Sequence, residues 1–253
     1  MSSLDDSNKK ILQLIKSEEP ANITLAFQLC LAIERKYNYE LAFELRRYPY
    51  ECLVYDIEIE SIKTRRLLNL DGYQLKALPS TILQFTRLQE LDLSNNAFQQ
   101  IPEEVFSLPS LTHLHLANNQ LKEITPNITQ LENLQILNLL DNQIASLPIE
   151  IGCLPQLTDL VLTRNHLTYL PPEIGQLQNL RRLYLSRNRL RELPETIGQL
   201  SKLMQLVFYH NQIRKLPETI SQLINLRELG VQGNPINQTH VNDMIPQFCK
   251  VYF

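Results

Sequence analysis

From Arg65 onward the chain repeats itself with a period of 23 residues. The repeating unit reads L-x-x-L-x-L-x-x-N-x-L-x-x-L-P-x-x-I-x-x-L-x-x and has seven apolar positions. In the first seven units, 48 of these 49 positions hold an apolar residue, and Arg65 is the exception. A repeat of this length indicates a solenoid, because one unit is too small to bury its apolar side and must stack on its neighbours. The units begin at Arg65, Leu88, Leu111, Leu134, Leu157, Leu180, Leu203 and Leu226.

Each unit predicts a short strand followed by a short helical turn. In the L-x-L segment, Leu91 and Leu93 point toward the core and Asp92 points outward, because side chains alternate along a strand. After the proline, Ile151 and Leu154 have the spacing of one helical or 3₁₀ turn. We expect the short amides of an asparagine column to hydrogen-bond backbone groups that the curved strands leave unpaired. This column is Asn96, Asn119, Asn142, Asn165, Asn188, Asn211 and Asn234.

These leucine, asparagine and proline positions resemble the leucine-rich repeat family, and specifically its 23-residue class with the pattern LPxxIxxLxxL. That class includes intracellular Ras-associated scaffold proteins and many uncharacterised bacterial proteins. The resemblance covers residues 65–236. It implies an α/β fold, a right-handed horseshoe-shaped solenoid with a parallel sheet on its concave side, and a function in binding proteins. We therefore predict eight leucine-rich repeats over residues 65–238.

Residues 1–64 differ in composition from the repeats. Apolar residues three or four apart in ILQLIKS and LAFQLCLAIE predict amphipathic helices. We expect these helices to form an N-terminal cap over the apolar end of the stack, which a soluble solenoid requires. A separate binding module is the alternative interpretation. The alternating segment LVYDIEIE predicts a short strand that leads into the first repeat.

Residues 239–253 break the period, and we predict that they form a short C-terminal cap. Four apolar residues fit one face of a closing helix, namely Val241, Met244, Ile245 and Phe248. The final segment KVYF predicts a last edge strand. Both ends of the stack are therefore expected to be covered.

The concave face predicts a binding surface in repeats four to seven. Outward-pointing strand positions have no folding reason to be apolar or aromatic, yet six of them are Ile136, Leu140, Val161, Tyr184, Val207 and Tyr209. Basic side chains lie among or beside them, namely Arg164, Arg182, Arg187 and His210. Exposed apolar groups with Tyr and Arg are typical of a protein-binding hot spot, although isolated exposed apolar residues are ordinary. The arginines predict an acidic or phosphorylated contact on the partner.

Two histidines on the same face raise the question of a metal site. His113 and His115 are expected beside Glu90 and Asp92, and such a group is chemically able to hold a zinc-like ion. An open strand surface gives the ligands no support from behind, and histidine–carboxylate neighbours are common cross-strand pairs. We therefore expect no metal or other cofactor. A metal- or carbohydrate-binding protein that uses these histidines is kept as an alternative.

Composition narrows the function further. The net charge of −3 argues against bulk attraction to nucleic acid or to anionic membranes. The chain has no recognisable signal peptide and no continuous apolar stretch long enough to cross a membrane. Its four cysteines are scattered, which predicts reduced thiols in the cytoplasm. No phosphate-binding loop, metalloprotease motif or nucleophile elbow is present, so we expect no enzymatic activity.

The sequence therefore predicts a non-catalytic, cytoplasmic module that binds a partner protein through its concave face. The resemblance implies two further hypotheses within signal transduction: an adaptor or regulator of a small GTPase, and a bacterial effector delivered into another cell. Fold-level analogy alone supports both.

Overall fold

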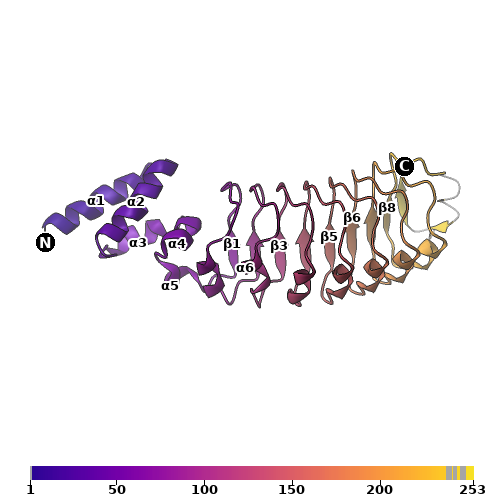
Figure 1. Ribbon diagram of the computed structural model, residues 1–253, viewed down its shortest axis with the longest axis horizontal. Helices are drawn as coiled ribbons and strands as arrows, with labels where there is room; N and C mark the ends of the chain where they lie inside the picture. Colours follow the sequence, from indigo (N-terminus) through magenta and orange to yellow (C-terminus); the bar gives the residue numbers. More distant parts are fainter. Residues whose placement is uncertain (1, 238–240, 242–243, 246–248) are drawn as a thin grey trace.

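The computed structural model describes residues 2–237, 241, 244–245 and 249–253 and shows an elongated molecule (Figure 1). A group of helices lies at the N-terminal end, and the repeats follow as a row of strands and short helical turns along the long axis. The C-terminus lies near the opposite end. Within the described residues, no helix is both long enough and apolar enough to cross a bilayer.

The strands pair in parallel and in chain order to form one open sheet. In a typical repeat the central leucine of a three-residue strand is buried, and the residues on either side of it face outward. Neighbouring strands are in register at intervals of one repeat, so Leu91 lies beside Leu114. The predicted parallel sheet and the predicted last strand are confirmed. The strands are β1 (Leu67–Asn69), β2 (Glu90–Asp92), β3 (His113–His115), β4 (Ile136–Asn138), β5 (Asp159–Val161), β6 (Arg182–Tyr184), β7 (Gln205–Val207), β8 (Glu228–Gly230) and β9 (Lys250–Tyr252).

A short helical turn follows each strand from β1 to β7, as the spacing after the prolines predicts. Most of these turns are 3₁₀ helices, and one is a single α-helical turn. Figure 1 shows them as a row below the strands. They are η1 (Ser80–Gln84), α6 (Glu103–Phe106), η2 (Pro126–Gln130), η3 (Ile149–Cys153), η4 (Pro172–Gln176), η5 (Glu195–Gln199) and η6 (Glu218–Gln222).

The asparagine column ties each repeat to the one before it. The Asn165 side chain is almost fully buried, and its Oδ1 accepts a hydrogen bond from the backbone N–H of Ile144 at 3.0 Å. Its Nδ2 donates to the carbonyl oxygens of Leu139 at 2.9 Å and Leu162 at 3.2 Å. Asn142 and Asn188 repeat this pattern with the equivalent backbone atoms of their own repeat and of the preceding one. The predicted role of the column is confirmed, since each amide satisfies buried backbone groups of two repeats.

The N-terminal residues form helices, as predicted, and pack onto the first repeat. Their buried side chains belong to the same continuous cluster as the leucines of the repeats. Thr81 Oγ1 donates to the carbonyl oxygen of Leu53 at 2.7 Å, and the Arg65 guanidinium donates to that of Arg46 at 3.0 Å. This shared core is what a cap needs. The helices are α1 (Ser2–Lys16), α2 (Pro20–Ala32), α3 (Tyr39–Leu45), α4 (Pro49–Tyr55) and α5 (Ile59–Ile62).

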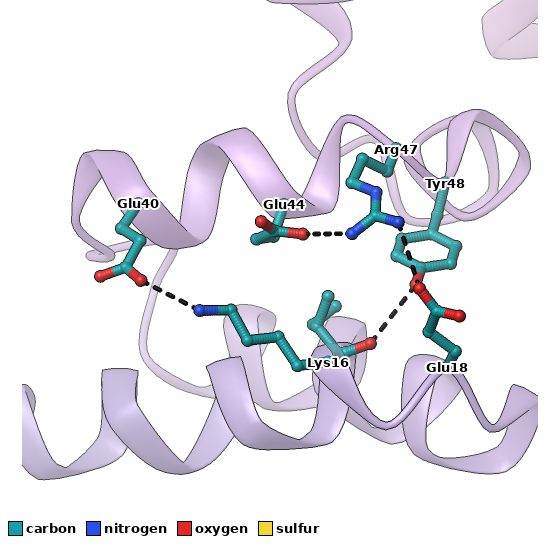
Figure 2. A network of polar contacts seen from close by, with 7 residues as sticks. Lys16, Glu18, Glu40, Glu44, Arg47 and Tyr48 are labelled. Carbon is teal, nitrogen blue, oxygen red and sulfur yellow. Dashed lines mark hydrogen bonds and ion pairs between the residues drawn. The ribbon is translucent and has the colours of Figure 1, made fainter.

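A network of polar contacts joins α3 to the end of α1 and the turn after it (Figure 2). Arg47 bridges Glu44 at 2.8 Å and Glu18 at 3.1 Å. Lys16 pairs with Glu40 at 3.2 Å, and the Tyr48 hydroxyl donates to a backbone carbonyl of α1 at 3.3 Å. Most of these charged groups are exposed, so they orient the helices more than they stabilise them.

The short strand predicted for LVYDIEIE is wrong. Its first three residues end α4, and Ile59–Ile62 form α5. The backbone between these helices turns through left-handed conformations at Asp56 and Glu58. The segment satisfies helical spacing as well as alternation, because Leu53 and Ile57 are four residues apart and both are buried. Pro49 at the start of α4 favours the helix.

The predicted closing helix lies largely outside the described residues. Val241 and Ile245 are described and are buried in the core. Met244 packs against that core, whereas Phe248 is among the residues that the structure does not describe.

We expect Asn165→Ala to lower the free energy of unfolding by about 3 kcal/mol, because it leaves one buried N–H and two buried carbonyl groups without their partner. Asn133→Ala is the matched control. The Asn133 side chain is exposed and makes one hydrogen bond, to the carbonyl of Pro109 at 3.0 Å, so we expect a loss below about 1 kcal/mol. Urea denaturation followed by circular dichroism measures both. Equal losses would contradict the assigned role of the column.

Thiol reactivity tests the packing of the cap. Cys30 in α2 and Cys52 in α4 are fully buried, and burial raises the pKa of both thiols to about 12. We expect a thiol reagent at pH 8 to modify the exposed Cys153 rapidly and to reach the other two only after unfolding. Mass spectrometry of peptides over time distinguishes the sites. If Cys30 or Cys52 reacts as fast as Cys153 in the native protein, the helices are not packed as described.

Candidate functional site

The predicted binding residues lie on the outward face of the sheet and on the turns directly after it. We call this face the open sheet face and the ten predicted residues the Tyr–Arg surface. Val161, Tyr184 and Val207 are direct neighbours on β5, β6 and β7. The Tyr–Arg surface comprises Ile136, Leu140, Val161, Arg164, Arg182, Tyr184, Arg187, Val207, Tyr209 and His210.

One apolar member differs from the expectation of an exposed side chain. Val207 is only 6% exposed, whereas Ile136, Val161 and Tyr184 are half-buried. Its neighbours in the sheet are Tyr184 and Gly230. Val207 therefore supports the surface from below and contributes little area of its own to a partner.

Hydrogen bonds hold the Tyr184 ring in place. The Tyr184 hydroxyl donates to Gln205 Oε1 at 2.6 Å, and Gln205 Nε2 donates to Glu228 Oε2 at 2.7 Å. Partial burial raises the pKa of the Tyr184 phenol and also that of Tyr209, so both are neutral at physiological pH. A fixed, neutral aromatic side chain loses little conformational entropy when a partner binds.

Two glycines of the eighth repeat make room for Tyr209 and His210 of the Tyr–Arg surface. A Cβ atom at Gly230 would lie 2.6 Å from the Tyr209 ring, and a Cβ at Gly233 would collide with Nδ1 of His210. Tyr209 and His210 therefore lean over the eighth repeat, which extends the surface toward the C-terminal end. The repeat pattern alone does not indicate this role of the two glycines.

The basic residues of the surface are not equally available. Arg182 forms an ion pair with Asp159, and Arg164 pairs with Asp141 at 3.0 Å. In the described part of the chain, no hydrogen bond or ion pair engages the Arg187 guanidinium. Arg187 is therefore the cation of the Tyr–Arg surface that is free to meet an acidic group.

Arg164 and Arg187 also occupy an unfavourable backbone conformation. The eighth position of every repeat has a positive φ, between 53° and 77°. Five of the eight repeats place Gly, Asn or Asp there, which tolerate this conformation, and another places His. Arginine gains nothing locally from a left-handed conformation, which costs about 1 kcal/mol for most residues. Because the same position of every repeat shares this conformation, the strain at Arg164 and Arg187 is imposed by the repeat architecture.

Positively and negatively charged residues are distributed unevenly along the chain. Residues 157–230 contain ten Lys and Arg against six Asp and Glu, whereas residues 1–156 contain 13 against 20. Residues 157–230, which hold all of the Tyr–Arg surface except Ile136 and Leu140, are thus positive although the whole chain is negative. This difference favours an acidic partner for these repeats.

A second exposed apolar region lies between the cap and β1, and the sequence analysis missed it. It is a hollow of about 750 Å³, which we call the cap hollow. Tyr39, Phe43 and Leu67 line it with exposed fractions of 75%, 55% and 52%. In the sequence, only Leu67, an apolar residue at an outward strand position, pointed to this region. Tyr39 and Phe43 belong to α3, which has no repeat pattern from which their position could be predicted. The other lining residues are Arg46, Arg47, Pro49, Arg65, Asn69 and Tyr73.

The histidine pair is placed as predicted, with Glu90 beside His113 and Asp92 beside His115. The nearest charged contact is diagonal, from His115 Nε2 to Glu90 Oε1 at 3.6 Å. His113 Nδ1 is instead 2.8 Å from the hydroxyl of Thr112. Among the described residues, no three His, Cys, Asp or Glu side chains are grouped so that they could hold a metal ion. Glu90 and His113, and Asp92 and His115, are cross-strand neighbours.

Family comparison agrees with this architecture. A model described as a leucine rich repeat matches residues 66–121, 86–144 and 109–167, and one described as a leucine-rich repeat region matches residues 149–247. This chain belongs to the leucine-rich repeat family. A comparison with curated proteins finds no match.

Solved structures show the same fold. A leucine-rich repeat protein of Leptospira interrogans is 42% identical, with a TM-score of 0.74, and the match covers 78% of this chain and 50% of that one. The plant peptide hormone receptor RGFR1, in complex with RGF2, is 30% identical, with a TM-score of 0.65 and coverages of 77% and 33%. An internalin of Listeria monocytogenes, 24% identical with a TM-score of 0.59 and coverages of 68% and 49%, shows the fold alone. The present chain spans half or less of each of these chains.

We expect Arg187→Asn to raise the free energy of unfolding by about 0.5–1 kcal/mol, because asparagine tolerates the left-handed conformation better than arginine. Arg189→Asn is the matched control, since Arg189 is an exposed arginine of the same repeat with a negative φ. Chemical denaturation of both variants measures the difference. A gain in the control as large as in Arg187→Asn would show that backbone strain is not the cause.

Proposed function

We propose that the chain is a non-catalytic module that captures a partner protein on the Tyr–Arg surface. The observation that carries this proposal is a pair of half-buried, outward-facing tyrosines, one of them held by a hydrogen bond, near an arginine that has no partner among the described residues. Tyr184 and Tyr209 face away from the core, and Arg187 lies on the turn after β6. Tyrosine and arginine dominate the binding energy of protein interfaces.

The family supports the same reading, because leucine-rich repeats are generally interaction modules. The receptor structure that is 30% identical to this chain was solved with a bound partner, RGF2. We propose that the partner of the present chain is likewise a protein, and that it places an acidic or phosphorylated group against Arg187. Arg164 and Arg182 contribute less, since carboxylates of this chain already pair with them.

The four free cysteines support a reducing, cytoplasmic setting for this function. The GTPase adaptor and the delivered effector stay predictions that rest on the resemblance.

We expect the double variant Tyr184→Ala/Arg187→Glu to lose a captured partner by at least about tenfold, because it removes an aromatic anchor and reverses a charge. The measurement is affinity capture from a lysate of the native host, with quantitative mass spectrometry. Tyr169→Ala/Arg191→Glu is the matched control, since both residues are exposed and lie outside the sheet. Equal melting temperatures of the variants establish that any loss is not due to unfolding.

One other outcome is informative. If the double variant and the wild type capture the same proteins equally, the Tyr–Arg surface is not the binding site. Phe43→Ser, which changes an exposed side chain of the cap hollow, then tests that region instead.

A further inference from the structure

A second cationic feature lies outside the Tyr–Arg surface, at the amino ends of β6, β7 and β8. It is a hollow of about 180 Å³ on the protein surface. Three of its five lining residues are positively charged and none is negatively charged. We call it the cationic hollow. Its lining residues are Arg181, Lys202, Met204, Asn225 and Arg227.

The sheet fixes the spacing of these residues. The backbone N–H of Met204 donates to the carbonyl of Arg181 at 2.8 Å, and that of Arg227 donates to the carbonyl of Met204 at 2.8 Å. The three residues therefore occupy equivalent positions in three adjacent repeats, which we call rungs. Since rungs are about 4.8 Å apart, the two arginines begin about 10 Å from each other with the half-buried Met204 between them. Two long side chains at this separation can close on one small group above the methionine.

The charges of the hollow are not compensated by the chain itself. Lys202 Nζ donates to Asn179 Oδ1 at 2.7 Å, which holds the ammonium group at the hollow. Over the residues that the structure describes, neither the Arg181 nor the Arg227 guanidinium has a hydrogen bond or an ion pair. The neighbouring Arg182, by contrast, is paired with Asp159. Three uncompensated like charges repel one another, and a bound anion would relieve this repulsion.

We propose that this hollow binds a phosphate monoester, carried by a phosphorylated Ser or Thr side chain of the partner protein. The identity of the carrier rests on the function proposed above. A phosphate monoester has a charge near −2 and three acceptor oxygens, which matches two guanidinium forks and one ammonium group. A carboxylate offers one negative charge and two oxygens, and a phosphodiester offers one negative charge. The monoester is therefore the anion that the hollow accommodates best.

The position of the hollow suits a partner on the open sheet face. Arg181 directly precedes Arg182 of the Tyr–Arg surface, at the amino end of β6. Arg187 lies three residues beyond the carboxyl end of the same strand. A partner that covers Tyr184 is thus flanked by unpaired cations at both ends of β6, and the phosphate would occupy the amino end.

Methionine NMR tests the hollow without any partner. The chain has three methionines, and Met204 is the one that lines the hollow, so Met1 and Met244 serve as internal references. We expect O-phosphoserine, added to the full chain at constant ionic strength, to shift the Met204 methyl signal saturably, with a dissociation constant on the order of 1–10 mM. Dimethyl phosphate and acetate should bind at least roughly fivefold more weakly, because each carries a single charge.

Variants link the shift to the arginines. Arg181→Gln/Arg227→Gln should abolish the saturable shift, and Arg191→Gln, an exposed arginine outside the hollow, should leave it unchanged. Absence of a shift with O-phosphoserine overturns the proposal, and so does a shift that persists in the double variant. Equal affinity for acetate makes the hollow a general anion site, and equal affinity for dimethyl phosphate points to nucleic acid or lipid; either result overturns it.

The NMR result, combined with capture by the Tyr184→Ala/Arg187→Glu variant, separates this inference from the proposed function. If the NMR shift fails while capture still depends on Tyr184 and Arg187, the Tyr–Arg surface stands and the hollow does not. If O-phosphoserine binds and the Tyr–Arg variant still captures everything, the hollow stands and the proposed surface is wrong. Loss of a phosphatase-sensitive partner from the Arg181→Gln/Arg227→Gln protein would support the hollow as the phosphate site.

Discussion

The buried asparagine amide is the interaction on which the rest of the molecule depends. Each strand is only three residues long, so the chain must turn at once and bury backbone groups that no strand pairs. Asn188 satisfies such groups in its own repeat and in the one before. The residue before each asparagine consequently adopts a left-handed conformation, and Arg187 is one of these residues. The geometry of the Tyr–Arg surface is therefore a product of the same contact that holds the stack together.

The apolar core continues into the helices at the N-terminal end. A leucine column that ended at β1 would expose a broad apolar face, and α4 and α5 bury Leu53, Ile57 and Ile62 there instead. At the other end β9 extends the sheet by one strand. The repeats can thus remain regular, while irregular sequence is confined to the two ends. Regularity in turn leaves the outward strand positions free to vary.

The repeat region was predictable because one period determines both burial and register. Any two residues one repeat apart become neighbours, so the positions of the leucines, the asparagines and the histidine pair could all be inferred. The ion pairs of Arg164 and Arg182 followed from the same rule, since Asp141 and Asp159 precede them by one repeat. The spacing of Arg181, Met204 and Arg227 follows from it too, since each lies one repeat after the last.

Other features could not be obtained from the period. The burial of Val207 depends on the surrounding side chains, including an aromatic ring that leans over a glycine. The cap contains no repeat, so the placement of Tyr39 and Phe43 beside Leu67 depends on tertiary packing alone. Local alternation misled the prediction for LVYDIEIE, because the same residues also satisfy helical spacing. Neighbouring residues that are set by the 23-residue period could be predicted from the sequence, whereas those that are set by tertiary packing could not.

The parallel register fixes the distances between equivalent side chains. Side chains at the same position of adjacent repeats lie about 4.8 Å apart, and the hydrogen bonds between the strands hold this spacing constant. Arg181 and Arg227, which have no side-chain partner among the described residues, lie two repeats apart. Arg187 lies beyond the other end of β6, the strand that follows Arg181. A partner would then be selected by the distance between its acidic groups as much as by their chemistry. Inserting a single repeat between two such cations would change that selection without altering any side chain.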